Sequence, residues 1–183
     1  GPFVFCIIAS FTDWNSMGDH DFIAFDNYIE LFGDWHFWKS LWNTFFYMIG
    51  IPIGMFWALF LALAFNRRMP GVKVFRVIYY IPVVSSIVAV SILWRWLYNG
   101  DYGLLNQFLS WAFNIKGPNW MNNEATVKPG ITAMCVWKGV GYTSLLYLGG
   151  LQNLPQSYYE AAYVDGASPF TIFRKITWPL MRP

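Results

Sequence analysis

Residues 42–65 read WNTFFYMIGIPIGMFWALFLALAF, a run of 24 residues without one charged side chain. As an α-helix this run would be about 36 Å long at roughly 1.5 Å per residue, and the hydrocarbon core of a bilayer is about 30 Å thick. Pro52 lies in the middle of the run and predicts a kink, which membrane helices tolerate when neighbouring groups satisfy the freed carbonyl. The run therefore predicts a membrane-spanning helix.

The composition extends this interpretation to the whole chain. Of the 183 residues, 56% are hydrophobic, 21% aromatic and 12% charged, whereas soluble domains carry about 25% charged residues. Further apolar stretches predict spans at 77–98 and 130–151, and residues 1–12 match half of a first span whose beginning is missing. We therefore expect an all-α, polytopic helical membrane protein, of which this chain is a fragment.

Lysine and arginine in the connections predict the orientation, because short cytoplasmic loops are enriched in these residues. Segment 12–41 holds six acidic residues and one lysine, whereas segment 152–183 holds three basic residues. The connection between the first two full spans has no acid and four basic residues, namely Arg67, Arg68, Lys73 and Arg76. Segment 152–183 is therefore expected on the cytoplasmic side.

Several kinds of site are not predicted. Cys6 and Cys135 lie in apolar runs and are expected to be small buried hydrophobes, and the isolated His20 and His36 predict no metal site. The net charge of +2 gives no reason to expect a nucleic-acid partner. No G-x-x-x-x-G-K-[ST] phosphate loop occurs in the sequence, so no cofactor is expected in this chain. The predicted spans hold no carboxylate pair, His/Cys site or activated nucleophile, which argues against a membrane enzyme.

The segment 152–179, QNLPQSYYEAAYVDGASPFTIFRKITWP, predicts two short helices joined by a glycine corner. Asn153 is a plausible cap for a first helix over 156–165, and Gly166 follows where a left-handed residue would stop it. Ser168 and Pro169 are favourable first residues for a second helix, which is expected to run to about Ile176 and to be interrupted by Pro179.

One face of the first helix predicts close contact with another protein. It carries Tyr158, Ala161, Ala162 and Asp165 at helical spacing. Two central alanines would let a partner's surface approach closely, and Phe170 and Phe173 of the second helix would pack beneath the membrane helices. An ordinary surface helix pair between spans is the alternative that spacing leaves open.

The same segment resembles the EAA loop of permease subunits of binding-protein-dependent ABC importers. The resemblance is carried by Glu160, Ala161, Ala162, Asp165, Gly166 and Ala167, followed by Phe173, Ile176 and Pro179. Three further stretches are similar to the sugar-permease branch of that family, related to the maltose transporter: FRVIYYIPVVSSIVAVSILWRWLY at 75–98, YGLLN at 102–106 and WKGVGYTSLLYLGGLQNLP at 137–155.

The resemblance implies a permease core of about six transmembrane helices. This chain would contain half of the first, the next three and the EAA loop, without the last two. It also implies a second permease subunit, two cytoplasmic ATPase subunits that hold ATP and Mg²⁺, and an extracytoplasmic solute-binding protein that delivers a sugar. Residues 160–167 would form the coupling helix that docks on an ATPase. The expected location is the bacterial or archaeal cytoplasmic membrane, as a multi-pass protein in the lipid bilayer.

Three residues of the 130–151 span are candidates for the solute path. Lys138 and Tyr142 lie one turn apart, and a charged residue within a span usually faces protein or water. The resemblance places sugar contacts at the positions of Gly139 and Tyr142. Gly139 alternatively serves helix packing, Tyr142 is alternatively a core aromatic residue, and Lys138 alternatively extends toward the membrane surface. A non-transporting scaffold or assembly protein is the alternative function, which would leave the glycine corner unexplained.

Overall fold

The computed structural model describes residues 1–14, 18, 21–66 and 71–181. These residues form α-helices, one π-helical turn and an isolated antiparallel bridge between Thr12 and Phe22, with no β-strand among them. His20, Arg67 and Arg68, which entered the sequence predictions, lie outside the described residues. The predicted all-α class is confirmed.

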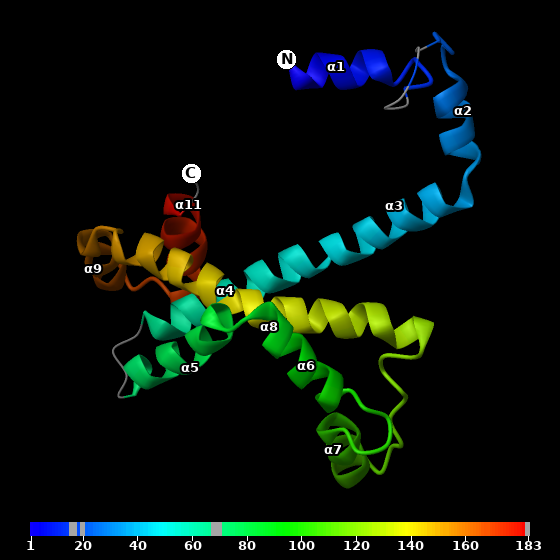
Figure 1. Cartoon of the computed structure of the whole chain (residues 1–183). Coiled ribbons are helices and arrows are strands. Elements are labelled where there is room, and N and C mark those ends of the chain that lie inside the picture. Colours follow the sequence, from blue (N-terminus) through cyan, green and yellow to red (C-terminus); the bar gives the residue numbers. More distant parts are fainter. Residues whose placement is uncertain (15–17, 19–20, 67–70, 182–183) are drawn as a thin grey trace. The chain divides into compact units, whose positions relative to one another are not determined.

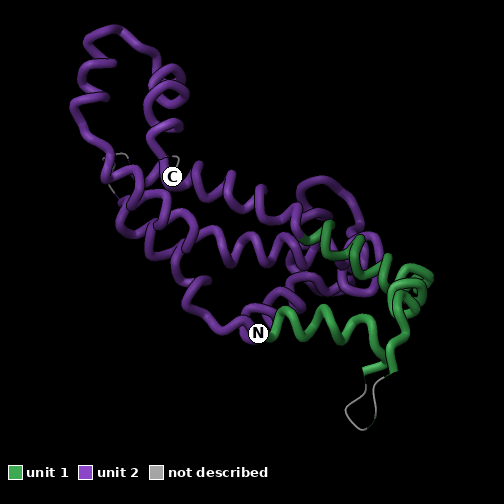
Figure 2. The backbone as a smooth tube through the Cα atoms, turned by 90° about the horizontal axis from the view of Figure 1, so that it is seen from above, with its two compact units in different colours: residues 1–47 green, residues 48–183 purple. Residues whose placement is uncertain are grey.

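The chain divides into two compact units, residues 1–47 and residues 48–183 (Figure 2). Figure 1 labels their helices except α10 and η1. The bounds are these: α1 Pro2–Ala9, α2 Asp26–Gly33, α3 Trp35–Met48, α4 Gly50–Phe65, α5 Val72–Val84, α6 Ile87–Leu97, α7 Leu104–Phe113, α8 Glu124–Gln152, α9 Gln156–Val164, α10 Pro169–Ile172, η1 Phe173–Thr177 and α11 Trp178–Leu180.

In the first unit, polar side chains connect the turn after α1 to α2. Asn27 Nδ2 donates to the carbonyl oxygens of Ser10 and Thr12 at 3.0 and 2.9 Å, and the hydroxyls of Ser10 and Tyr28 are 2.7 Å apart. The two Asn27 bonds satisfy backbone carbonyls of the turn that follows α1. Of the predicted half span 1–12, only Pro2–Ala9 is helical.

The stretch Trp35–Phe65, which contains α3 and α4, is long and apolar enough to cross a membrane. It has 31 residues and a mean hydropathy of 2.2, and only 17% of its most apolar 18 residues are buried within the protein. A buried core helix of a soluble protein would be largely covered, whereas here side chains such as Phe56, 66% exposed, face outward. Exposed apolar surface on this scale indicates contact with lipid or other protein.

Small residues allow α4 to pack along α8. Ala58 and Ala62 on α4 have no exposed surface, and a β-carbon at Gly50 would lie 2.9 Å from Thr132 Cγ2 of α8. Close backbone approach through small residues is typical of membrane helix pairs. At one end of this pair, Ala62 and Phe65 form a buried cluster with Leu148 and Leu151.

The predicted span 77–98 is broken in the structure. The helix begins earlier, at Val72, ends at Val84 and resumes as α6 at Ile87, and the two parts are bent by 102°. Ser85 and Ser86 have extended backbones at the break, and Ser86 Oγ accepts from Val88 N at 3.3 Å, which caps α6. Counted as one bent span, this pair is the second candidate for crossing a membrane among the described residues.

The third predicted span, 130–151, lies within the longer helix α8. Asn123 caps its start, since Asn123 Oδ1 accepts from Ala125 N at 2.9 Å. The helix has 29 residues, so it is about 44 Å long. It packs against both α4 and α5 and ends at Gln152, immediately before α9.

Candidate functional site

Helix α9 is stopped by a glycine at the corner that follows it, as the sequence predicts. Gly166 has φ +69°, Ala167 N donates to Ala162 O at 2.9 Å, and Gly166 N donates to Tyr163 O at 3.1 Å. These two bonds form the Schellman motif, which satisfies the last carbonyls of a helix through a left-handed residue. The predicted helix–corner–helix arrangement of 156–176 is therefore confirmed at its corner.

The second helix starts where it was predicted. Ser168 Oγ accepts from Thr171 N at 3.3 Å, and Pro169 is the first residue of α10. The first helix, α9, begins at Gln156 as predicted, but its predicted cap is wrong, because Pro155 occupies the cap position without a side-chain bond and Asn153 ends α8 instead.

Pro179 does not interrupt the second helix. The backbone continues from α10 through the π-helical turn η1 into α11 and ends at Leu180, beyond the predicted end at Ile176. A proline ring in a regular α-helix clashes with the carbonyl four residues earlier, here that of Lys175. The wider winding of a π-turn changes that spacing, so the helix accommodates Pro179.

The alanine face of α9 is turned partly toward the chain's own second helix. Ala162 is only 8% exposed, and a groove of about 380 Å³ separates the face from η1 and α11; it is lined by Tyr158, Ala161, Ala162, Asp165, Lys175, Ile176, Pro179 and Leu180. The hydroxyls of Tyr159 and Thr177, 3.1 Å apart, join the two helices. The inference that both alanines are open to a partner is therefore wrong for Ala162, whereas Ala161 is exposed.

The exposed surface of α9 and its corner is formed by residues other than Ala162. Tyr163 is 65% exposed and Val164 is 88% exposed, and Glu160, Asp165 and Gly166 are exposed as well. The second helix is divided in the same way, since Ile172 is buried but Phe170 is 71% exposed. The prediction that Phe170 packs beneath the membrane helices is therefore wrong. Apolar side chains at the tip of the corner are thus available for contact.

Lys138, a candidate for the solute path, is bound to the end of α5. Its Nζ donates to the carbonyl oxygens of Pro82, Val83 and Ser85 at 3.1, 3.2 and 3.0 Å (sequence separations of 53–56 residues). A lysine ammonium has three N–H donors, so none remains for a solute in this conformation. Its positive charge also lies at the negative end of the α5 dipole.

The other two path candidates lie apart from this contact. Tyr142 is 54% exposed, and a β-carbon at Gly139 would meet nothing within 4 Å. Gly139 therefore does not serve packing within the described residues. The assignment of both residues to a solute path stays a prediction.

Sequence reasoning missed a close contact between α5 and α8. A β-carbon at Gly141 would overlap the carbonyl oxygen of Tyr79, and Ser144, one turn later, is 1% exposed and donates to Gly141 O at 2.8 Å. The available signal was the spacing of small residues, Gly141 and Ser144, on one face of an apolar helix.

The structure also shows where the potential metal-ligating side chains and the two cysteines lie. Among the described residues no group of three or more His, Cys, Asp or Glu side chains could hold a metal ion. Cys6 and Cys135 are free and exposed, so the prediction that both are buried is wrong. The outer face of a membrane helix is as apolar as a protein core, and an apolar sequence context does not distinguish the two.

Comparisons with known proteins agree with the helical architecture. The chain is 35% identical over 180 residues to the probable ABC transporter permease protein YesP of Bacillus subtilis, covering 97% of this chain and 58% of that protein. It is 33% identical over 177 residues to the trehalose/maltose transport system permease protein MalF of Thermococcus litoralis, with 96% and 60% covered. The chain thus spans about three fifths of the length of these relatives.

A solved structure shows the same fold. The crystal structure of a bacterial alginate ABC transporter, in complex with a periplasmic protein bound to an alginate pentasaccharide, matches with a TM-score of 0.82 and 25% identity, covering 98% of this chain and 60% of that one. Residues 50–183 match the family described as the binding-protein-dependent transport system inner membrane component. The chain belongs to this family of membrane permease components of ABC transporters.

Proposed function

We propose that this chain is part of the transmembrane permease subunit of an ATP-driven importer that moves a sugar or related solute across the cytoplasmic membrane. The observation that carries the proposal is the rigid corner of α9, whose Schellman motif holds exposed apolar residues at its tip. This corner lies within the family match over residues 50–183. A stiff, exposed element at the end of a long helix is suited to transmit a displacement from a partner.

The energy for transport is proposed to come from separate ATPase subunits. The sequence has no phosphate-binding loop, so ATP and Mg²⁺ would be held by those subunits. The coupling helix would be α9, with Tyr163, Val164 and the Gly166 corner in contact with an ATPase. This contact surface differs from the alanine face expected from spacing, because Ala162 is buried.

The names of the relatives support a carbohydrate as the solute. The Thermococcus litoralis relative is a trehalose/maltose permease, and the solved transporter was crystallised with a periplasmic protein carrying an alginate pentasaccharide. For this chain we infer a solute of the same class, delivered by an extracytoplasmic binding protein. A second permease subunit would complete the path. We expect the permease to be a multi-pass membrane protein.

Disulfide cross-linking in the full-length permease tests the coupling contact. Val164→Cys should cross-link to an ATPase subunit that carries single cysteines around its proposed docking surface, and the cross-link should block uptake. Ala162→Cys is the matched control, because it lies half a turn away on the same helix but is buried. If neither variant cross-links, or if the Val164→Cys cross-link leaves uptake unchanged, the coupling role is wrong.

A further inference from the structure

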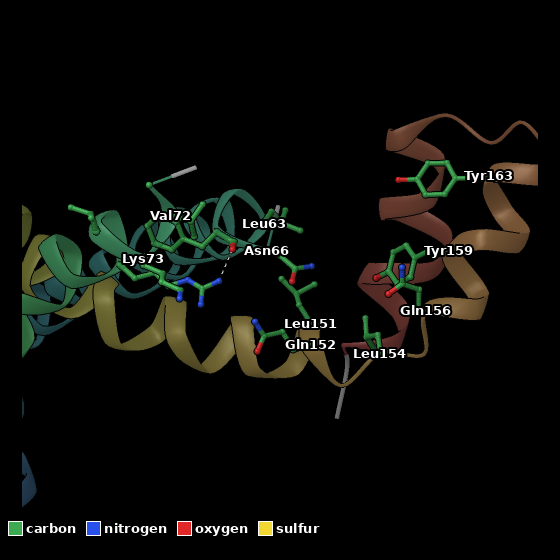
Figure 3. A pocket seen from close by; sticks show the side chains of 14 residues that line it. Leu63, Asn66, Val72, Lys73, Leu151, Gln152, Leu154, Gln156, Tyr159 and Tyr163 are labelled. Atoms are coloured by element: carbon green, nitrogen blue, oxygen red, sulfur yellow. Dashed lines mark hydrogen bonds between the residues drawn. The ribbon is translucent and has the colours of Figure 1, made fainter. Parts of the chain in front are cut away.

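A basic cleft lies between the ends of two helix pairs within the second unit. One wall comes from the end of α4 and the start of α5, and the other from the end of α8 and from α9 (Figure 3). Its volume is about 1020 Å³, at the top of the range of roughly 300–1,000 Å³ that small-molecule sites have. The cleft is therefore large enough for a ligand.

The charge in the basic cleft is entirely positive. Lys73 and Arg76 line it, and no aspartate or glutamate is among its lining residues. Neither side chain makes an ion pair with any described residue. Arg76 Nη2 donates to Phe65 O at 2.7 Å (the dashed line in Figure 3), but Arg76 Nε is buried without a hydrogen-bond partner. Buried donors in proteins nearly always have an acceptor, so this guanidinium is only partly satisfied by the described residues.

The remaining lining is divided between hydrogen-bonding and apolar groups. Figure 3 shows Gln156, Tyr159 and Tyr163 on the α9 side, with the tyrosine hydroxyls turned toward the side on which Lys73 lies. Leu151 and Leu154 form an apolar wall beside them. Such a lining suits a ligand that is anionic at one end and apolar at the other. A free inorganic anion would leave the leucines without a partner.

We propose that the basic cleft binds the phosphate headgroup of an anionic phospholipid from the cytoplasmic leaflet. Lys73 and the guanidinium of Arg76 would contact the phosphate, and the leucine wall would contact the glycerol and the first acyl carbons. The placement rests on the proposed function's membrane orientation, in which the connection between α4 and α5 is cytoplasmic. That leaflet surface attracts basic residues by about 1 kcal/mol each, and in this orientation the headgroups would lie at the depth where α4 ends.

The test measures lipid binding by the full-length permease in its assembled transporter. Dioleoylphosphatidylglycerol and dioleoylphosphatidylcholine are titrated separately and bound lipid is counted by native mass spectrometry. We expect preference for phosphatidylglycerol, a loss of about fivefold in affinity for Lys73→Gln and of about thirtyfold for Lys73→Gln with Arg76→Gln, at about 1 kcal/mol per basic residue. Lys73 is exposed, and its side chain makes no hydrogen bond within the described residues, so Lys73→Gln should fold normally.

Arg174→Gln is the matched control, because it removes an exposed basic side chain of the same cytoplasmic region outside the cleft. It should bind phosphatidylglycerol as the parent protein does. Equal affinity for both lipids, an unchanged affinity in Lys73→Gln, or complete displacement by millimolar inorganic phosphate would each overturn the lipid proposal. Uptake and ATPase activity are measured on the same samples in phosphatidylcholine alone, so that failure of the transport proposal is recognised independently.

Discussion

Lys138 Nζ lies 3.0 Å from the carbonyl oxygen of Ser85, at the point where α5 ends and the chain turns by 102° into α6. Together with Pro82 O and Val83 O, this oxygen belongs to the helix end that lacks backbone donors. The lysine thus replaces the missing donors with a charged group from α8. The cost of a charge within an apolar region is offset here by three charge-assisted hydrogen bonds.

Replacing Lys138 with methionine should destabilise the permease. The carbonyls of Pro82, Val83 and Ser85 would lose their charged donor, and hydrogen bonds to charged groups contribute about 1.5–3 kcal/mol. We expect a lower midpoint of thermal unfolding for the full-length protein in detergent. Lys128→Met is the control, because Lys128 lies on the same helix and its side chain makes no hydrogen bond within the described residues. Identical midpoints for Lys138→Met and the parent would show that the three hydrogen bonds do not stabilise the break between α5 and α6.

Gly141 should not tolerate a larger side chain. A β-carbon there would overlap Tyr79 O, a backbone atom that cannot rotate away, and overpacking costs about 1–3 kcal/mol. Gly141→Ala should therefore lower the thermal midpoint, while Gly139→Ala, two residues earlier in open space, should leave it unchanged or raise it because alanine favours helix. The opposite order of the two midpoints would contradict the observed packing of α5 on α8.

Gly166→Val should impair coupling without preventing insertion. The left-handed conformation at φ +69° costs residues with a β-carbon roughly 1–2 kcal/mol, and a β-branched side chain is especially unfavourable there. We expect reduced ATPase docking and reduced uptake at a normal membrane level of the protein. Ser157→Val is the control, because it places the same β-branched side chain at an exposed position of α9 outside residues 160–167, and it should retain uptake. Normal uptake by Gly166→Val would refute the coupling assignment.

Tyr142→Ala tests the predicted solute path. The ring is 54% exposed on α8, so its removal should leave stability nearly unchanged. Sugar transport should fall more than basal ATPase activity. Leu146→Ala, one turn further on the same face and 58% exposed, is the control for removing apolar surface. If Tyr142→Ala transports sugar at the level of the parent protein, the path assignment is wrong.

The elements governed by neighbouring residues were predictable. The uncharged run 42–65, the stop at Gly166 and the start at Ser168 depend on hydropathy or on hydrogen bonds within a few residues. Ala167 N reaches Ala162 O, and Thr171 N reaches Ser168 Oγ. Such bonds form wherever the local residues permit them, so the sequence pattern is sufficient to locate them.

Contacts between distant segments were not predictable in this way. Lys138 is more than 50 residues from each of its three acceptors, and Gly141 packs against the backbone of Tyr79 in another helix. The buried Ala162 lines a groove whose other wall is a helix that was expected to end earlier. Each depends on which face of one helix meets another. Hydropathy does not specify that choice, because faces that contact lipid and faces that contact protein are equally apolar.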